Sequence, residues 1–348
     1  MMAESVLAWS LPLDVDVVKI HFNHNTGSTS SDGITIQEDE TTITAPEWMS
    51  SKNEESAYTV AVDDPTVKVE FYCSDTQDFS SVQIYSYRTS GSSTWALDTE
   101  TITFNPSGSS GTVSFDTKSN GKQPTTVGEY SVSWSWRVLY VDASEQSPPI
   151  EIDTSSHTFY NVLSIPTAPM AVPWVEVLDY SCDWASGETT EVNVATEVAK
   201  TLYSDLGIDY QYSTRYTDGT DNEELWLQTF LDDVSDNNTL VSNCSDMANL
   251  FCTFSSALGC ESQTKALYGS MHTRSIYVIG DSIPLEKDFG LHQFGWLNSK
   301  VYDSCLWLWN NGVIHPYNMS LLDYKGWLIS TGSPSDLDPI TTVITEKP

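Results

Sequence analysis

The sequence predicts a chain of two domains, an all-β sandwich followed by an α+β domain. The first support is length, because 348 residues of which 39% are hydrophobic are enough for two packed cores. The second is a change of pattern: short alternating apolar runs fill the first half, whereas helical spacing begins after the proline-rich stretch 165–173. We therefore divide the chain into a β-sandwich at 1–165, a stiff linker at 166–175 and a second domain at 176–348.

Alternation predicts the strands of the first domain. In segment 130–140 aromatic and aliphatic residues occupy every second position, and serines and Arg137 lie between them. This pattern is typical of an antiparallel strand with one face against a core. Further strands are expected at 17–22, 67–72, 81–88, 100–104, 112–115 and 159–163. Together they predict a sandwich that is immunoglobulin-like in the loose sense of that term.

The second domain is predicted to begin with helices and to continue with strands. Apolar residues at helical spacing predict helices over 191–205, 222–234 and 243–258. Strand-like runs follow at 263–269, 274–279, 289–297 and 300–309. This order of elements is typical of an α+β domain.

The charge of the chain excludes some partners. With 48 acidic against 15 basic residues the formal net charge is −33, so the chain lacks the Lys and Arg clusters that nucleic-acid binding requires. The two halves share the charge almost evenly, which indicates a surface property and not a functional tail. We find no run of 18 apolar residues and no signal-peptide pattern, so we expect no membrane insertion. The expected location is the cytoplasm or, if an export signal was removed, the cell surface or exterior.

No cofactor is expected. Calcium is the one metal that the acidity favours, and its candidate ligands are Asp232, Asp233 and Asp236. Their spacing lacks the EF-hand pattern, so we interpret the stretch as a solvated loop, with calcium as the alternative. The cysteines are too sparse for a disulfide scaffold and have no zinc-site spacing, so most should be free thiols: Cys73, Cys182, Cys244, Cys252, Cys260 and Cys305.

One cysteine has an unusual position. If Asn243 caps the third helix and Asp246 is its third residue, Cys244 lies in the first turn. There the unpaired N–H groups and the helix dipole favour a thiolate. The alternative is a small buried hydrophobe, which is our interpretation of Cys252 and Cys260. Cys244 differs from them only if a base points at it.

The candidate base is His292, in a predicted hairpin. A two-residue turn at Asn298-Ser299 places Phe294 opposite Asp303 and His292 opposite Cys305. His292 and Asp303 are then diagonal neighbours on a face that is otherwise apolar, and an unpaired Asp there would be costly. We therefore expect the two side chains to form a pair, with His272 and His315 as alternative bases.

The order of a helix-start Cys, a strand His and an Asp on the next strand resembles the transglutaminase-like superfamily, whose fold is papain-like. The resemblance covers roughly residues 190–310 and rests on segment 243–260, on His292 and on segment 300–305. It implies a catalytic triad of Cys244, His292 and Asp303. Candidate side chains for holding the oxyanion are Trp226, Gln228, Asn238 and Asn243.

The resemblance implies acyl transfer through a thioester, on a protein or peptide substrate. Similar proteins of bacteria and archaea are more often peptidase- or amidase-like hydrolases than cross-linkers, so we favour hydrolysis. Segment 316–330 is expected either to line the cleft or to serve packing. The alternative function is a non-catalytic surface or ligand-binding protein with a degenerate transglutaminase-like domain, and the Ser-, Thr- and Trp-rich first half favours it.

Overall fold

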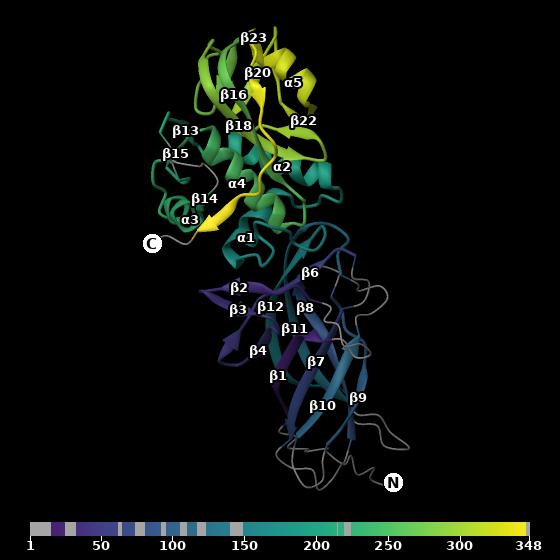
Figure 1. The fold of residues 1–348 in the computed structure, drawn as a ribbon. Coiled ribbons are helices and arrows are strands. Elements are labelled where there is room, and N and C mark those ends of the chain that lie inside the picture. The colour runs from purple at the N-terminus through teal and green to yellow at the C-terminus, as the bar shows by residue number, and fades with distance from the viewer. Residues whose placement is uncertain are drawn as a thin grey trace, which may run out of the picture.

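The structure is a computed structural model, and it describes residues 15–24, 33–61, 65–73, 81–91, 95–104, 110–116, 123–139, 149–213, 215–218 and 224–345. The described chain is β-rich, with several sheets and five helices. The first half lies below and the second half above in Figure 1, and the two meet near α1 and β6. None of the helices in these ranges has the length and apolar character needed to cross a bilayer.

Two five-stranded sheets form the first half. One has the order β10 (Ser110–Asp116), β7 (Thr66–Cys73), β1 (Val15–His24), β4 (Glu47–Met49) and β5 (Lys52–Asn53). The other has the order β6 (Ser56–Thr59), β12 (Ile150–Val162), β11 (Gly128–Leu139), β8 (Ser81–Gly91) and β9 (Glu100–Thr103). A small hairpin of β2 (Ile36–Glu38) and β3 (Thr41–Ile43) lies beside them. The predicted strands of this half are all present, and residue 140 of the strand predicted at 130–140 lies outside the described ranges.

The alternation of β11 explains the core of this half. Val132, Trp134 and Trp136 are at most 1% exposed and pack with aromatic residues of β1 and β7 in one apolar cluster. Ser135 departs from the pattern: it is buried too, and its hydroxyl donates to Glu151. The two sheets therefore enclose a single core between them.

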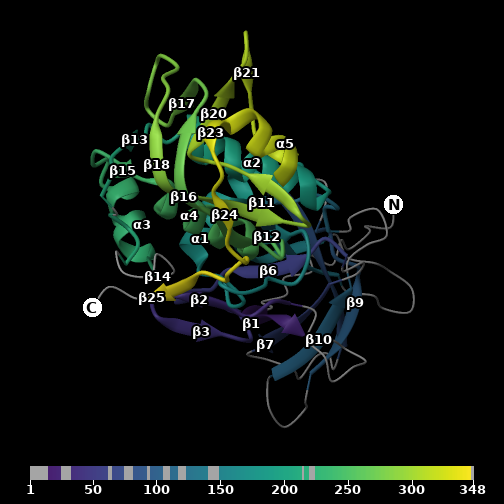
Figure 2. The same ribbon diagram turned by 45° about the horizontal axis from the view of Figure 1, so that its top comes forward.

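The second half begins with helices. These are α1 (Val175–Trp184), α2 (Glu191–Ser204), α3 (Leu227–Ser235) and α4 (Cys244–Ala257). Every residue of α4 is buried, so this helix forms the centre of the half. Two parallel pairs flank it: β13 (Asp209–Tyr210) with β15 (Val241–Ser242), and β14 (Glu224–Trp226) with β25 (Val343–Thr345). Figure 2 shows β25 beside β14.

A sheet packs against α4. Its order is β22 (Tyr317–Ser320), β19 (Lys300–Tyr302), β18 (Asp288–Leu297), β16 (Gln263–Thr273) and β23 (Ile329–Gly332), and β24 (Ser335–Asp336) also pairs with β16. A smaller sheet contains β17 (Ile276–Val278), β20 (Leu306–Trp309) and β21 (Val313–Ile314). The last helix, α5 (Leu321–Leu328), follows β22. Both predicted parts of this half, helices and then strands, are present.

Three sequence predictions need correction here. The second predicted helix begins at Leu227, because Glu224–Trp226 pairs with β25 as a strand; residues 222–223 lie outside the described ranges. The strand predicted at 300–309 is two strands, interrupted at Asp303–Cys305. Helix α1 was not predicted, and it starts inside the linker range 166–175.

The proline-rich stretch is no free spacer. The backbone N–H of Thr167 donates to Ser256 of α4, and that of Ser164 donates to Leu258 just after it. Gly259 allows this approach, since a Cβ at its φ of 90° would lie 2.4 Å from the Ser164 carbonyl oxygen. The stretch is therefore fixed to the end of α4 through Ser164 and Thr167.

Candidate functional site

The start of α4 has the cap that the sequence predicts. The Asn243 side chain accepts hydrogen bonds from the N–H groups of Ser245 and Asp246, at 2.9 and 3.1 Å. The Asp246 carboxylate in turn accepts the Asn243 N–H at 3.2 Å, which completes a capping box. Cys244 is the first residue of the helix and 7% exposed, so its sulfur lies near the positive end of the helix dipole.

The predicted hairpin has the predicted turn and register up to Tyr302, but the expected pairs of Phe294 with Asp303 and of His292 with Cys305 are not among its strand pairs. Trp296 pairs with Val301 and Gly295 with Tyr302, and the turn residues Asn298 and Ser299 have φ of 50° and 61°. Positive φ at both positions is the signature of the two-residue hairpin turn. Regular pairing ends after Tyr302, one residue before Asp303.

The structure brings His292 and Asp303 together. The Nε2 atom of His292 lies 2.8 Å from Oδ2 of Asp303, and both side chains are fully buried. The expected contact between them is confirmed. If the strands had stayed paired, His292 and Asp303 would have been diagonal neighbours on two adjacent strands. Instead the strand ends before Asp303, and the Asp303 carboxylate points toward the His292 ring.

Asp303 itself causes the break between β19 and β20. Its Oδ1 accepts the N–H groups of Cys305 and Leu306, at 2.8 and 3.0 Å, so the side chain closes a local turn. Its own N–H donates to the Pro316 carbonyl. The Ser304 hydroxyl donates to the Met247 carbonyl at 3.1 Å, which fixes this turn to the first part of α4.

Tyr324 of α5 is a member of the site that sequence reasoning missed. Its hydroxyl donates to Oδ2 of Asp303 and lies 2.9 Å from Nε2 of His292. The side chain is fully buried. Segment 316–330 was expected to line the cleft or to pack, but nothing in its sequence indicates that this hydroxyl reaches the two buried residues.

The surroundings of His292 favour its protonated form. Burial lowers its pKa, but the charge and hydrogen bond of Asp303 and the nearby Cys244 thiol outweigh burial, and the pKa is raised well above its usual value. The other ring nitrogen, Nδ1, has no hydrogen-bond partner among the described residues. The ring is thus anchored at Nε2 and open at Nδ1, with a thiol close by.

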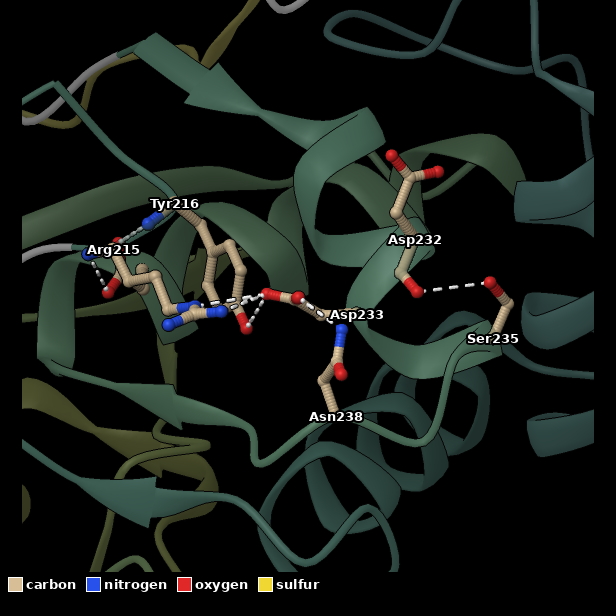
Figure 3. Close-up of polar contacts among 7 residues, drawn as sticks. Arg215, Tyr216, Asp232, Asp233, Ser235 and Asn238 are labelled. Atoms are coloured by element: carbon tan, nitrogen blue, oxygen red, sulfur yellow. Dashed lines mark hydrogen bonds and ion pairs between the residues drawn. The ribbon is translucent and has the colours of Figure 1, made fainter.

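A second network orders the chain beside the start of α4. Asp246 is fully buried and accepts the N–H groups of Arg215 and Tyr216 and the hydroxyl of Thr217. Figure 3 shows the continuation: the Arg215 guanidinium lies 2.6 Å from Asp233, which also accepts from Tyr216 and Asn238. Arg215 holds the pKa of Asp233 below its usual value against the opposing effect of burial. Asp246 thereby serves both the helix cap and the neighbouring loop.

The calcium candidates do not converge. Asp233 pairs with Arg215, and Asp232 accepts from the Gln228 amide at 2.9 Å within α3. Asp236 is the exposed C-cap residue of α3. Among the described residues no group of three or more His, Cys, Asp or Glu side chains is arranged to hold a metal ion.

The four oxyanion candidates have different surroundings. The Gln228 amide donates to Asp232, the Asn238 amide donates to Asp233 at 3.0 Å, and the Asn243 oxygen caps α4. Trp226 precedes α3, and its backbone N–H donates to the Tyr216 carbonyl. These assignments stay predictions, since no contact ties any of the four side chains to the Cys244 sulfur.

The alternative bases lie elsewhere. His272 lies in β16, and it bridges Asp288 and Glu286 at 2.8 and 3.2 Å. His315 is exposed and packs on Trp307. All six cysteines are free thiols, and burial raises the pKa of Cys182, Cys252, Cys260 and Cys305. Of the three histidines, only His292 combines burial with a carboxylate partner and an open ring nitrogen.

Comparison with known proteins gives matches among solved structures only. No family model and no curated protein matches the chain. Among solved structures, the chain is similar to a transglutaminase of red sea bream, with 11% sequence identity and a TM-score of 0.38. The similarity covers 73% of this chain and 49% of the bream protein, so the chain spans about half the length of that neighbour.

Proposed function

We propose that the protein catalyses acyl transfer on amide bonds through a triad of Cys244, His292 and Asp303, in a second half with a transglutaminase-like, papain-like fold. The observation that supports it best is the state of His292. Its ring is held at Nε2 by a buried carboxylate, while Nδ1 is left open near a helix-start thiol. This is the arrangement that a general base for a cysteine nucleophile requires.

The reaction has two stages, acylation of Cys244 and release of the acyl group. His292 takes the thiol proton at Nδ1, and the Cys244 sulfur attacks an amide carbonyl to give a tetrahedral oxyanion. The backbone N–H of Cys244, which the capping box does not use, stabilises this charge. The carbon–nitrogen bond then breaks, His292 returns the proton to the leaving amine, and an acyl thioester remains. Water or an amine attacks the thioester and releases the Cys244 thiol.

Water is the proposed acceptor and a protein or peptide the proposed substrate, as the family resemblance implies. The same three residues serve an amine acceptor, so the acceptor is a matter for experiment. In this proposal the first half is an immunoglobulin-like sandwich, and the protein needs no nucleic acid, membrane insertion or cofactor.

Alkylation of the native protein tests the nucleophile. We expect iodoacetamide at pH 7 to modify Cys244 at least about tenfold faster in the wild type than in the His292→Gln variant, because the variant lacks the base. Peptide mapping by mass spectrometry gives the rate at each cysteine. Cys252 is an internal reference, since it is a fully buried thiol of the same helix. If Cys244 reacts no faster than Cys252, the activated nucleophile is excluded.

Activity assays separate the proposal from a binding function. Labelled casein reports peptide-bond cleavage, released ammonia reports side-chain amide hydrolysis, and a biotinylated primary amine reports transfer to an amine. Any such activity should disappear in Cys244→Ala. If Cys244→Ala retains full function in the biological assay of the protein, the non-catalytic binding role is supported instead.

A further inference from the structure

The hydroxyl of Tyr324 takes part in a complete set of contacts around Asp303. Oδ1 of Asp303 accepts two backbone N–H groups, and Oδ2 is shared by the Tyr324 hydroxyl and Nε2 of His292. A carboxylate that leaves water needs such donors, because each unmet lone pair costs free energy. Asp303 is thus held by four donors from three different parts of the chain.

The direction of the phenol proton follows from the charges around it. Burial and the charge of Asp303 raise the pKa of Tyr324 well above its usual value, so the hydroxyl keeps its proton. That single proton is donated to Asp303, and the phenol oxygen can only accept from His292. Both neighbours of Nε2 are therefore acceptors, and Nε2 carries a hydrogen. The open lone pair of a neutral ring then lies at Nδ1, the ring nitrogen without a hydrogen-bond partner among the described residues.

Sharing Oδ2 between two donors also weakens its hold on the ring. A fully buried Asp that served His292 alone would stabilise the imidazolium strongly. A general base must instead give its proton back to the leaving amine near neutral pH. The hydrogen bond from the phenol stabilises part of the negative charge on Asp303. Less of that charge is then available to stabilise the imidazolium of His292.

We propose that Tyr324 is a positioning residue of the site, whose hydroxyl shares the Asp303 carboxylate with His292 so that Asp303 orients the ring while stabilising the imidazolium less than an unshared carboxylate would. This inference rests on the proposed function. Packing alone does not explain the hydroxyl. The ring contacts with Phe294 and His292, at 5.2 and 6.4 Å between centroids, would be kept by phenylalanine, which has no polar group to bury.

The test is the titration of His292 in full-length protein labelled with ¹⁵N-histidine. A Cys244→Ala background removes coupling to the thiol, and His292→Gln assigns the signal. In Tyr324→Phe we expect the pKa of His292 to rise by about 0.5 or more, because Oδ2 then has a single side-chain donor. The Nε2 proton signal should move downfield for the same reason. An unchanged or lower pKa would overturn the proposal.

Tyr216→Phe is the matched control. It removes another buried phenol that donates to a carboxylate, Asp233 at 3.1 Å, and it should lower thermal stability without moving the His292 titration. A melting curve of each variant shows that it is folded. The alkylation comparison between wild type and His292→Gln shows whether a negative result concerns the role of Tyr324 or the proposed function itself. If it shows an activated Cys244 while Tyr324→Phe leaves His292 unchanged, the role of Tyr324 is excluded and the proposed function stands.

Discussion

A single carboxylate decides the local geometry of the site. Asp303 ends a strand, closes a turn with its own side chain and anchors His292, all through hydrogen bonds within 3.0 Å. An alanine at this position would lose the turn and the anchor together. Two consequences of this residue, the broken strand and the ring orientation, therefore have one cause.

Replacing Asp303 with asparagine should destabilise the protein in a pH-dependent way. The raised pKa of His292 means that the folded state binds its proton more tightly than the unfolded state, whose histidine has a pKa near 6.5. The stabilisation is therefore complete below pH 6.5 and is lost as the pH rises through the folded-state pKa. We expect Asp303→Asn to cost about 3 kcal/mol at pH 6 and clearly less at pH 9. Urea denaturation at both pH values measures it, and a cost that grows with pH would contradict the assignment.

The close packing of α4 against β18 depends on Gly295. A Cβ at this position would lie 2.1 Å from Cδ1 of Phe251, far inside van der Waals contact. The glycine therefore allows the helix that carries Cys244 to approach the strand that carries His292. It is a packing requirement between two elements and not a requirement of the turn.

Gly295→Ala should force these two elements apart. We expect a loss of about 2 kcal/mol in unfolding free energy, together with slower alkylation of Cys244. Gly290→Ala in the same strand is the control, because nothing lies within 4 Å of its added Cβ, and its effect should stay within about 0.5 kcal/mol. If the two variants were equally stable, α4 would be able to move away from β18 without cost, and the packing role of Gly295 would be excluded.

The sequence predicted those elements that local pattern determines. The hairpin register follows from its two-residue turn, and the start of α4 follows from Asn243 and Asp246, so both were predicted. Strand β14 was missed because its partner β25 lies more than 100 residues further along the chain. Tyr324 was missed for a similar reason: only the packing of α5 brings its hydroxyl to His292 and Asp303. Contacts between distant segments have no local pattern to reveal them.

At the scale of the whole molecule, the junction of the two halves contains an acidic cluster. The Tyr160 hydroxyl of β12 lies 2.6 Å from Glu55 and 2.5 Å from Asp179 of α1. One proton cannot be donated to two carboxylates, so the arrangement favours a protonated acid. Burial, Asp179, Glu38 and Glu129 raise the pKa of Glu55 accordingly. The evenly spread charge of the chain thus has a local consequence where the halves meet.

Glu55→Gln should stabilise the protein at neutral pH. The raised pKa of Glu55 means that its contribution to stability is complete below the unfolded value of 4.5 and is lost as the pH rises through the folded value. A neutral glutamine avoids this loss. We expect a gain of about 0.5 kcal/mol at pH 7, reduced by solvent screening, and none near pH 4. Thermal melts at both pH values measure it. Glu261→Gln, which removes an exposed acid, shows how much comes from net charge alone.

The core between the halves has a consequence for any attempt to divide the molecule. One apolar cluster contains residues of both, from the first half Ile36, Ile43, Ala57, Val127, Tyr160 and Val162, and from α1 Val177, Leu178 and Cys182. A protease cut in the stretch 163–174 would therefore not release two independent bodies, and separate expression of residues 166–348 would leave the apolar side of α1 uncovered. The two halves should melt in one cooperative transition, and an exchange of the first half for another module would have to preserve this shared surface.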